Sequence, residues 1–343
     1  MGFKKAVPIG LEISRGYISA VELEFKDNAV FLKKSGKIEL PPLLVTPSLS
    51  EENISDAEKF KEAVKTLFEN AGISGKHISL AIPDASVKIA FLEFEDIPEE
   101  REKIIELIKW NLKKALPFPS DETVVDFQIT EMPSQESRLY RLVIALMRKD
   151  VLEQYENLLN DCHVIPDTII PSSFAAYNLY HDCLSEPPAS ALLALSKKEI
   201  TVLIVKDGKP CFHRSKEIDG EKEALRELLA SFSYYQDIQG NMPARIYLFD
   251  NGLEAVHLKA EMETSFGGVD IKTISLSDVI NPHTKDFGVG VKGVNGSMNP
   301  VRKDVINKDR QDMQGNALLS GLSNGMNIFS GAAGAALKTE DGD

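Results

Sequence analysis

The chain has 343 residues, of which 43% are hydrophobic and 27% are charged, as is usual for a globular protein. The net charge of -13 disfavours a general nucleic-acid binder and broad adhesion to an anionic membrane, because both need Lys and Arg to meet negative charge. No stretch reaches the roughly 18 to 20 apolar residues of a membrane-spanning helix, and the N-terminus lacks the apolar segment of a signal peptide. We therefore expect a cytoplasmic protein with two domains or two lobes.

Cysteine and histidine use indicates neither disulfides nor a metal site. Cys162, Cys183 and Cys211 are an odd, scattered set without a C-x-x-C spacing, which predicts reduced thiols. The six histidines form no H-E-x-x-H or other close pair, and no serine lies in a G-x-S-x-G elbow between a predicted strand and a predicted helix. The sequence therefore predicts no metal ligands and no catalytic nucleophile.

The first patterned stretch, Pro8 to Leu23, predicts a tight two-strand hairpin, because apolar residues alternate on both sides of Gly16. The elements predicted next are short strands at 30–32 and 37–40, a helix from Ser55 or Asp56 to Gly72, and a strand at 78–82. Three strands, a helix and a further strand suit one α/β lobe.

From Val87 the pattern changes to a β-α-β-β-α run of about 75 residues, which predicts a compact subdomain. Its helix is predicted to begin near Asp96 and to end at the Pro117-Phe118-Pro119 corner, since proline fixes φ and restricts the residue before it. The remaining elements are predicted as strands at 87–91, 124–129 and 139–146, and a helix over 151–159.

A second lobe is predicted after a helix at 172–180 and a linker at 184–188. Asp207-Gly208 is typical of a two-residue hairpin turn between strands. The predicted elements are strands at 191–194, 200–205 and 209–213, a helix over 225–235, a strand at 246–249, a helix from about 253 and a strand at 269–274. This order echoes that of the first lobe.

The stretch from Asn281 to about Asn324 is rich in Gly, Asn, Asp, Lys and Ser, which predicts a mobile loop. A helix-like signal returns at 328–337 before a polar tail. We therefore divide the chain into a first lobe (1–84), an inserted subdomain (85–165), a return to the first lobe (166–186), a second lobe (187–280), a flexible loop (281–325), and a C-terminal helix and tail (326–343).

The segment from Ile108 to Ile129, with WNLKKALPFPSDETVVDFQ at its centre, resembles the PilM family of type IV pilus assembly proteins. In that family a helix ends at a similar (I/L)PFP corner and a (L/V)D(F/Y)Q strand follows. Arg148 to Tyr155, SYYQ at 233–236 and GAAGAAL near the end are also similar, and the resemblance covers nearly the whole chain except 282–324. It implies a bilobal α/β fold of the actin-like, ribonuclease H-like ATPase type, related to FtsA, with the subdomain inserted into the first lobe.

The resemblance also implies partners and cofactors. Members of the family are expected to bind ATP with Mg²⁺ between the lobes and to hold the cytoplasmic N-terminal tail of the membrane protein PilN. The chain would then lie at the inner membrane through its partners, among other proteins of a pilus or secretion platform, with its own oligomeric state left open. Trp110 and Phe118 are candidate partner contacts, although a core or subdomain-interface position suits Trp110 as well.

The first hairpin departs from the phosphate loop that the resemblance implies. Actin-like loops use Asp-x-Gly, in which the acid serves Mg²⁺ and the glycine lets backbone N–H groups approach the phosphate. Here Glu12 stands for the Asp, Ser14 for the Gly, and Ser19 for a common Lys. We place these three residues and Gly10 in an altered nucleotide cleft.

The other two nucleotide elements are altered as well. The second loop reads ALSKKEIT where a pattern of the D-x-G-x-x-x-T type is expected, so Ser196 replaces the glycine and only the Thr is kept, as Thr201 and one position later. Lys197 and Lys198 could supply phosphate charge, but a solvated hairpin turn explains them more simply. The adenosine turn keeps Asn251 and Gly252 in place of a run of glycines.

The sequence thus favours a non-enzymatic, actin-like adaptor that presents a groove between the first lobe and its inserted subdomain to a partner's tail. No cofactor is then required, and ATP and Mg²⁺ would bind only if the altered cleft still accepts them. The alternative is an ATP-binding switch or weak ATPase of the same machinery. A third interpretation is a relative that serves type II secretion or mannose-sensitive pili.

Overall fold

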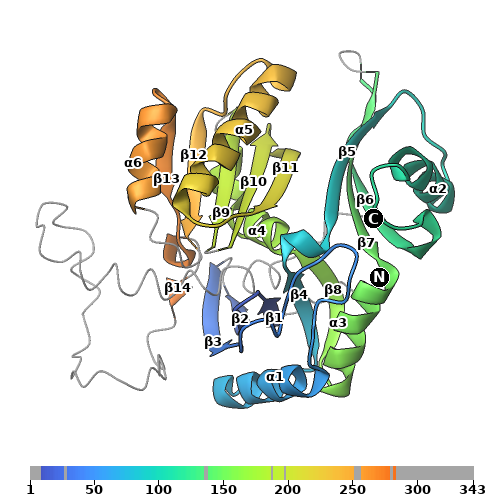
Figure 1. Ribbon diagram of the computed structural model, residues 1–343, viewed down its shortest axis with the longest axis vertical. Coiled ribbons are helices and arrows are strands. Elements are labelled where there is room, and N and C mark those ends of the chain that lie inside the picture. Colours follow the sequence, from blue (N-terminus) through green and yellow to red (C-terminus); the bar gives the residue numbers. More distant parts are fainter. Residues whose placement is uncertain are drawn as a thin grey trace, which may run out of the picture.

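A computed structural model describes residues 9–26, 29–134, 138–186, 188–196, 198–250, 256–278 and 281–282. These residues form two lobes and an inserted subdomain, each built on its own sheet (Figure 1). None of the helices in the described ranges is long and apolar enough to cross a membrane.

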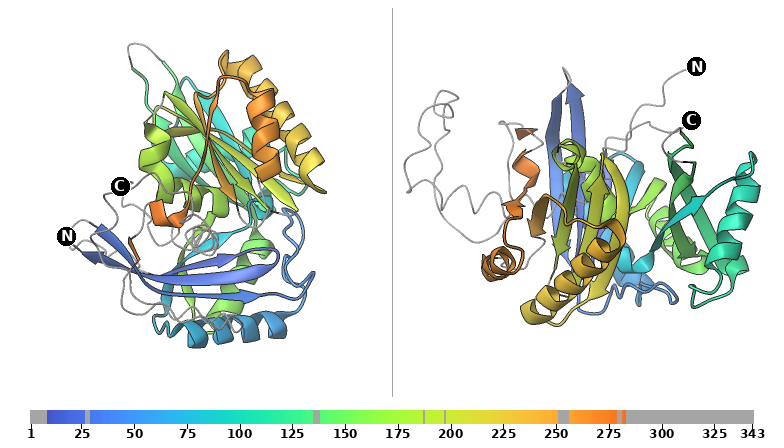
Figure 2. Two further views of the ribbon diagram at one scale, coloured as in Figure 1. Left: turned by 90° about the vertical axis from the view of Figure 1, so that its left-hand side faces the viewer. Right: turned by 90° about the horizontal axis from the view of Figure 1, so that it is seen from above.

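The first lobe is a mixed sheet in which β1 pairs antiparallel with β2 and parallel with β4. Its strands in spatial order are β14 (Asn281–Pro282), β3 (Ala29–Glu39), β2 (Tyr17–Lys26), β1 (Ile9–Ile13), β4 (His77–Ile82) and β8 (Ile165–Pro171). Helices α1 (Ala57–Ala71) and α3 (Lys149–Asp161) cover one face, and α4 (Ser172–Ser185) lies on the other, against the second lobe (Figure 2).

Helix α1 forms as the sequence predicts. The carboxylate of Asp56 accepts the N–H of Lys59 at 3.1 Å, and Gly72 ends the helix at φ 65°, a conformation that favours glycine. Its apolar stripe of Phe60, Val64 and Leu67 is buried on the sheet.

One long strand, β3, replaces the two short strands predicted for this region. Gly36 allows it to continue beneath α1, since a Cβ at this position would lie 2.8 Å from the Cβ of Ala71 and 3.1 Å from Leu67 Cδ1. Gly36 is therefore a point of close helix–strand contact.

The second lobe repeats the plan. Its strands in spatial order are β11 (Lys209–Glu217), β10 (Glu199–Lys206), β9 (Ala189–Leu195), β12 (Arg245–Asp250) and β13 (Asp270–Thr273). Helices α5 (Glu221–Gln239) and α6 (Val256–Ser265) pack on one face and α4 on the other. Helix α4 runs into the predicted linker at 184–188 because Leu184 is fully buried between the lobes.

The inserted subdomain is a three-stranded antiparallel sheet with one helix on its outer face. Its strands in spatial order are β5 (Lys88–Phe94), β7 (Tyr140–Arg148) and β6 (Thr123–Glu131). Helix α2 (Arg101–Leu112) begins five residues later than Asp96 and has no side-chain cap, and a turn separates its end from the Pro117 corner. Short 3₁₀ turns, η1 (Asp84–Ser86) and η2 (Ser120–Glu122), precede β5 and β6, and η3 (Leu276–Asp278) follows β13.

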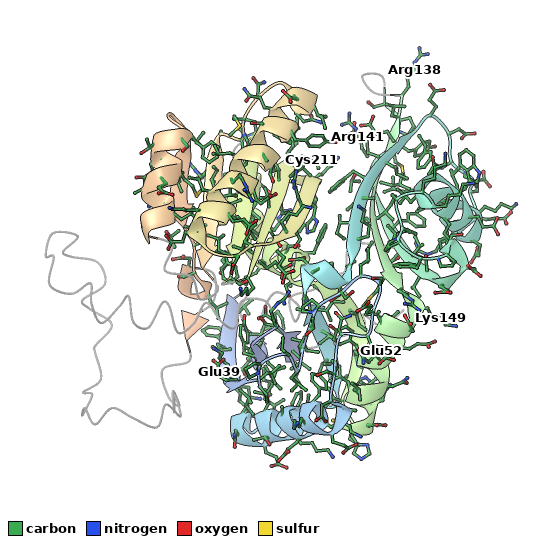
Figure 3. All side chains as sticks on the ribbon, in the orientation of Figure 1. Glu39, Glu52, Arg138, Arg141, Lys149 and Cys211 are labelled. Atoms are coloured by element: carbon green, nitrogen blue, oxygen red, sulfur yellow. The ribbon has the colours of Figure 1, made fainter. Side chains whose placement is uncertain are left out.

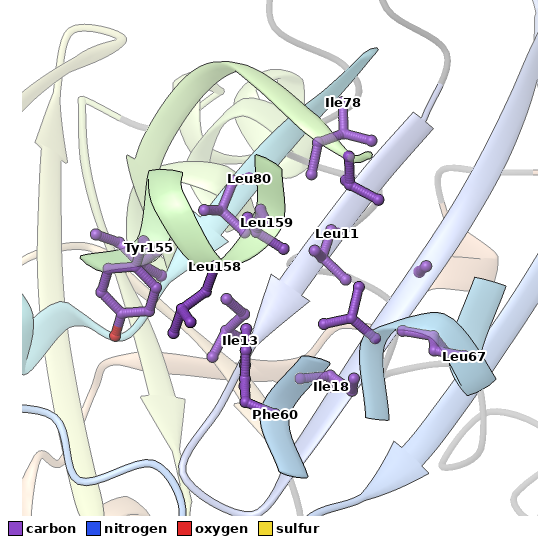
Figure 4. Packing of buried hydrophobic residues seen from close by; sticks show 14 of the residues in the cluster. Leu11, Ile13, Ile18, Phe60, Leu67, Ile78, Leu80, Tyr155, Leu158 and Leu159 are labelled. Atoms are coloured by element: carbon purple, nitrogen blue, oxygen red, sulfur yellow. The ribbon is translucent and has the colours of Figure 1, made fainter. Parts of the chain in front are cut away.

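The predicted boundary of the inserted subdomain is wrong for α3. This helix was expected in the subdomain, but Tyr155, Leu158 and Leu159 pack with Ile13 and Leu80 in the core of the first lobe (Figure 4). The subdomain is therefore β5-α2-β6-β7, and the chain returns to the first lobe at Arg148 rather than near 165. Of the expected flexible loop only Asn281 and Pro282 are described, paired in parallel with β3, and the C-terminal helix and tail lie outside the described residues.

Candidate functional sites

The turn of the first hairpin faces the second lobe, as an actin-like fold requires. Arg15 Nη2 lies 3.1 Å from Glu217 Oε1 at the end of β11. The backbone of the turn is used inside the first lobe, because Ser14 donates its N–H to the Tyr17 carbonyl at 2.9 Å and Leu40 donates to the Gly16 carbonyl at 2.8 Å. The Ser14 N–H is therefore not directed at a ligand.

Glu12 and Gly10 lie within β1 rather than in the turn. Glu12 is only 2% exposed and lies between Ser19 of β2 and Ala81 of β4, with Ser19 Oγ 3.4 Å from its Oε2. Gly10 is two residues further from the turn, between Val21 and Ser79. The hairpin thus brings Glu12 and Ser19 together and leaves Gly10 apart.

In the second turn, between β9 and β10, Ser196 forms hydrogen bonds with other residues of the same turn. Its hydroxyl oxygen accepts the N–H groups of Glu199 at 3.0 Å and Lys198 at 3.4 Å, and its own N–H donates to the Glu199 carbonyl at 2.9 Å. Lys198 forms an ion pair with Asp219 at 2.8 Å, as expected for a solvated turn. Lys197, Asn251 and Gly252 lie outside the described residues.

Asp84 organises a buried polar cluster that the sequence did not reveal. Its Oδ1 accepts the hydroxyl of Ser173 at 2.5 Å and the Ser173 N–H at 3.2 Å, and its Oδ2 accepts the hydroxyl of Thr201 at 3.2 Å. His213 Nε2 lies 3.1 Å from Ser173 Oγ and 3.6 Å from Asp84 Oδ1. The cluster joins η1, the start of α4, and strands β10 and β11, so it connects the two lobes.

This Asp, Ser and His set is not arranged as a nucleophilic triad. In such a triad the histidine lies between the carboxylate and the hydroxyl, each on a different ring nitrogen. Here Ser173 contacts Asp84 directly, and both face the same nitrogen of His213. All three side chains are buried, so the cluster is a structural connection between the lobes.

Glu199 adds a second carboxyl group beside this cluster. Ser215 donates its hydroxyl to Glu199 Oε1 at 2.5 Å. Burial and the nearby charge of Asp84 raise the pKa of Glu199 to about 7, against the opposing effects of the Ser215 hydrogen bond and the charge of Arg15.

The described residues do not fit the nucleoside triphosphate that the fold implies. Asp84 and Glu199 bring two carboxyl groups close together between the lobes, Glu12 is buried within β1, and Arg15 is paired with Glu217. The N–H groups of the second turn are bonded to Ser196 rather than directed outward. A phosphate chain would meet negative charge without the backbone donors that such loops supply. Within the described ranges, no three His, Cys, Asp or Glu side chains form a group that could hold a metal ion.

A separate groove of about 220 Å³ lies between the first lobe and the inserted subdomain. Its apolar lining is Ile82, Val87, Val124, Ala145, Met147, Leu152, Pro166, Ile169, Ile170 and Pro171. Its polar lining is Asp126, Glu156, Asp167 and Thr168.

Strand alternation explains how the inserted subdomain lines this groove. In β6 and β7, Val125, Ile144 and Leu146 point to α2, so their neighbours Val124 and Ala145 point to the opposite face. The other wall is β8, which contributes every residue from Pro166 to Pro171. Strands β6 and β8 are each outermost in their sheets among the described residues.

Trp110 and Phe118 do not line this groove. Trp110 is 66% exposed on α2, with Lys113 Nζ 5.5 Å from its ring centre, and Phe118 is buried behind the proline corner. Their role as partner contacts stays a prediction. The sequence predicted the groove's location but not its residues, which come from strands far apart in the chain.

The three cysteines are free, as the sequence predicts. Burial raises the pKa of the Cys211 thiol, which keeps it protonated and unreactive. Cys211 lies on the side of the second lobe that faces Arg141 of β7 (Figure 3). Arg141 in turn pairs with Glu93 and Glu131, each at 2.8 Å.

Comparisons with known proteins bear on the family and the fold of the chain. The family model described as type IV pilus assembly protein PilM matches residues 10–235, more than half of the chain. A solved PilM-PilN type IV pilus biogenesis complex matches with a TM-score of 0.77 at 17% identity, covering 97% of this chain and 98% of that chain. This likeness confirms the predicted bilobal, actin-like fold.

Two further solved structures are more distant. A protein of unknown function with an actin-like ATPase fold, from Bacteroides thetaiotaomicron VPI-5482, has a TM-score of 0.49 and 11% identity, covering 82% of this chain and 95% of that chain. The cytoplasmic domain of EpsL, an inner-membrane component of the type II secretion system of Vibrio cholerae, has a TM-score of 0.46 and 10% identity, covering 72% and 83%. No curated protein matches the sequence.

Replacing Glu199 with Gln should reduce the pH dependence of the free energy of unfolding between about pH 5 and pH 8. The fold raises the pKa of this carboxyl from 4.5 to about 7, so the native state keeps a proton that the unfolded chain releases, and it loses stability as the pH rises through this range. Between these pH values the free energy of unfolding should fall by about 1 to 2 kcal/mol less in the variant than in the parent protein.

Urea unfolding at the two pH values measures this difference. Glu62→Gln, on the exposed side of α1, is the matched control and should behave as the parent does. Equal pH dependence in Glu199→Gln and the parent protein would show that this carboxyl does not limit stability.

Proposed function

Because the chain belongs to the family of the type IV pilus assembly protein PilM, we propose that it is an adaptor of the inner-membrane platform that assembles type IV pili. The solved relative that shares its fold is part of a PilM-PilN complex. In our proposal this chain likewise holds the cytoplasmic N-terminal tail of a PilN-like membrane protein. It would work in the cytoplasm and be held at the membrane by that partner.

The groove between β6 and β8 is the site that we propose for the tail. Ten of its fourteen lining residues are apolar, a composition suited to anchoring apolar side chains of a peptide. One wall runs the length of β8, so an extended peptide fits along it better than a helix, which is about 10 Å wide. This groove is the single observation that carries the proposal.

We further propose that the chain does not hydrolyse ATP. In support, Ser196 hydrogen-bonds the N–H groups of the second turn, and the carboxyl groups of Asp84 and Glu199 between the lobes would repel phosphates. The alternative, an ATP-driven switch or weak ATPase, needs a cation or backbone donors at this point, and the described residues direct neither of these at the cleft.

Filling the groove should weaken binding of the tail. Ala145 lies on β7, and replacing it with Leu or Phe puts new side-chain atoms into the space that the tail would occupy. We expect at least about a tenfold loss of affinity for Phe and a smaller loss for Leu. Calorimetry with a synthetic peptide of the PilN-like protein's N-terminal tail measures both.

Ala230→Phe, on the exposed side of α5, is the matched control and should leave the affinity unchanged. Thermal unfolding of each variant shows whether the fold is intact. Unchanged tail binding by a folded Ala145→Phe protein would exclude the groove as the tail site.

Restoring the first phosphate loop should not create an ATPase. The double variant Glu12→Asp with Ser14→Gly recovers one motif, but Ser196 and Glu199 still alter the second. Phosphate release from Mg-ATP should stay at background for the parent and the double variant. Micromolar Mg-ATP binding with measurable turnover by the parent protein would favour the switch instead, and retained tail binding by the double variant would show that it is folded.

A further inference from the structure

All the ionisable side chains that line the groove are acidic. Its carboxylates come from three elements: Asp126 from β6, Glu156 from α3 and Asp167 from β8. None of its fourteen lining residues is Lys, Arg or His. An occupant therefore meets apolar side chains and a rim that attracts only positive charge.

From this rim we propose that the groove selects its tail by charge: it binds an apolar peptide segment that carries a Lys or Arg, and Glu156 and Asp167 recognise that cation. The inference rests on the proposed function, since it names the chemistry of the tail that the groove would hold. It adds a specificity determinant at positions that no motif in the sequence indicates.

The three carboxylates differ in whether a neighbouring side chain already compensates their negative charge. Asp126 is paired with Arg101, which stacks on Phe127 with its guanidinium carbon 4.6 Å from the ring centre. Asp167 has His77 Nδ1 at 2.9 Å, and an imidazole, unlike the guanidinium beside Asp126, is not permanently charged. Glu156 forms no ion pair with any described residue. Glu156 and Asp167 are therefore the groups with charge left for an occupant.

An inner-membrane protein's cytoplasmic tail matches this rim in charge. Cytoplasmic segments close to a membrane-spanning helix carry an excess of Lys and Arg, because these residues are retained on that side during insertion. The end of this chain does not match, since Lys338 is followed by Glu340, Asp341 and Asp343. Its beginning includes Lys4 and Lys5, so the test must separate the chain's own residues from the partner's tail.

Calorimetry with the full chain and a synthetic peptide of the PilN-like tail tests the inference. Glu156→Gln and Asp167→Asn each remove one negative charge and should each weaken binding roughly two- to fivefold. Raising the salt concentration to about 0.5 M should reduce the difference in affinity between each variant and the parent protein. Replacing the tail's Lys or Arg with Gln should cause a similar loss. Combining Glu156→Lys with a tail whose basic residue is changed to Glu should recover part of the affinity that either change alone removes.

Glu62→Gln is the matched control, because it removes an exposed carboxylate from α1, away from the groove lining. Binding that is indifferent to Glu156, Asp167 and the tail's basic residue, but is lost in Ala145→Phe, would overturn charge selection and leave the groove as the tail site. Tighter peptide binding by a Lys4→Gln/Lys5→Gln variant, with no effect of the tail's own charge, would also overturn it, since the chain's N-terminus would then be the basic occupant. No binding of the parent chain to the peptide would contradict the proposed function itself.

Discussion

The buried carboxylate of Asp84 holds the two lobes in a fixed relation. It is 5% exposed and accepts hydrogen bonds from Ser173 on α4 and Thr201 on β10, with His213 of β11 at the same point. A carboxylate buried to this extent is tolerable only when donors surround it, and the hydroxyls that supply them would themselves lose partners if the lobes separated. The arrangement of the two lobes therefore depends on this group together with the apolar cluster around α4.

Strands β4 and β8 of the first lobe contribute both to the polar cluster around Asp84 and to the groove. Ile82 at the end of β4 lines the groove, and Asp84 follows two residues later. Pro171 at the end of β8 lines the groove, and Ser173 follows two residues later. The carboxyl ends of parallel strands thus position the cluster on one side and the proposed peptide site on the other.

Local sequence signals predicted most elements but not their partners. Asp56 and Gly72 mark the ends of α1, and Asp207-Gly208 marks the β10–β11 turn, because each acts through its own backbone. The stripe of α3 showed that one side of the helix is buried, but it could not show that the partner is the first-lobe sheet. The single strand β3 was predicted as two short strands, because the helix that packs on Gly36 comes later in the chain.

The candidate sites, too, could be predicted from local sequence signals only in part. The altered positions Glu12, Ser14 and Ser196 could be found by motif, but their hydrogen bonds within the hairpin and the second turn come only from the structure. Asp84, by contrast, followed Pro83 like any loop residue, and its role depends on groups about 90 and 117 positions away. The groove's lining spans 82–171, so only tertiary structure brings it together.

Hydrogen–deuterium exchange of the full chain, with and without a saturating tail peptide, tests the central claim most directly. Our account predicts slower exchange at 124–126 of β6 and 167–170 of β8, with little change in the turn around Ser196. Protection confined to the interlobe turns, or to α2 around Trp110, would show that the tail binds elsewhere and would contradict the account.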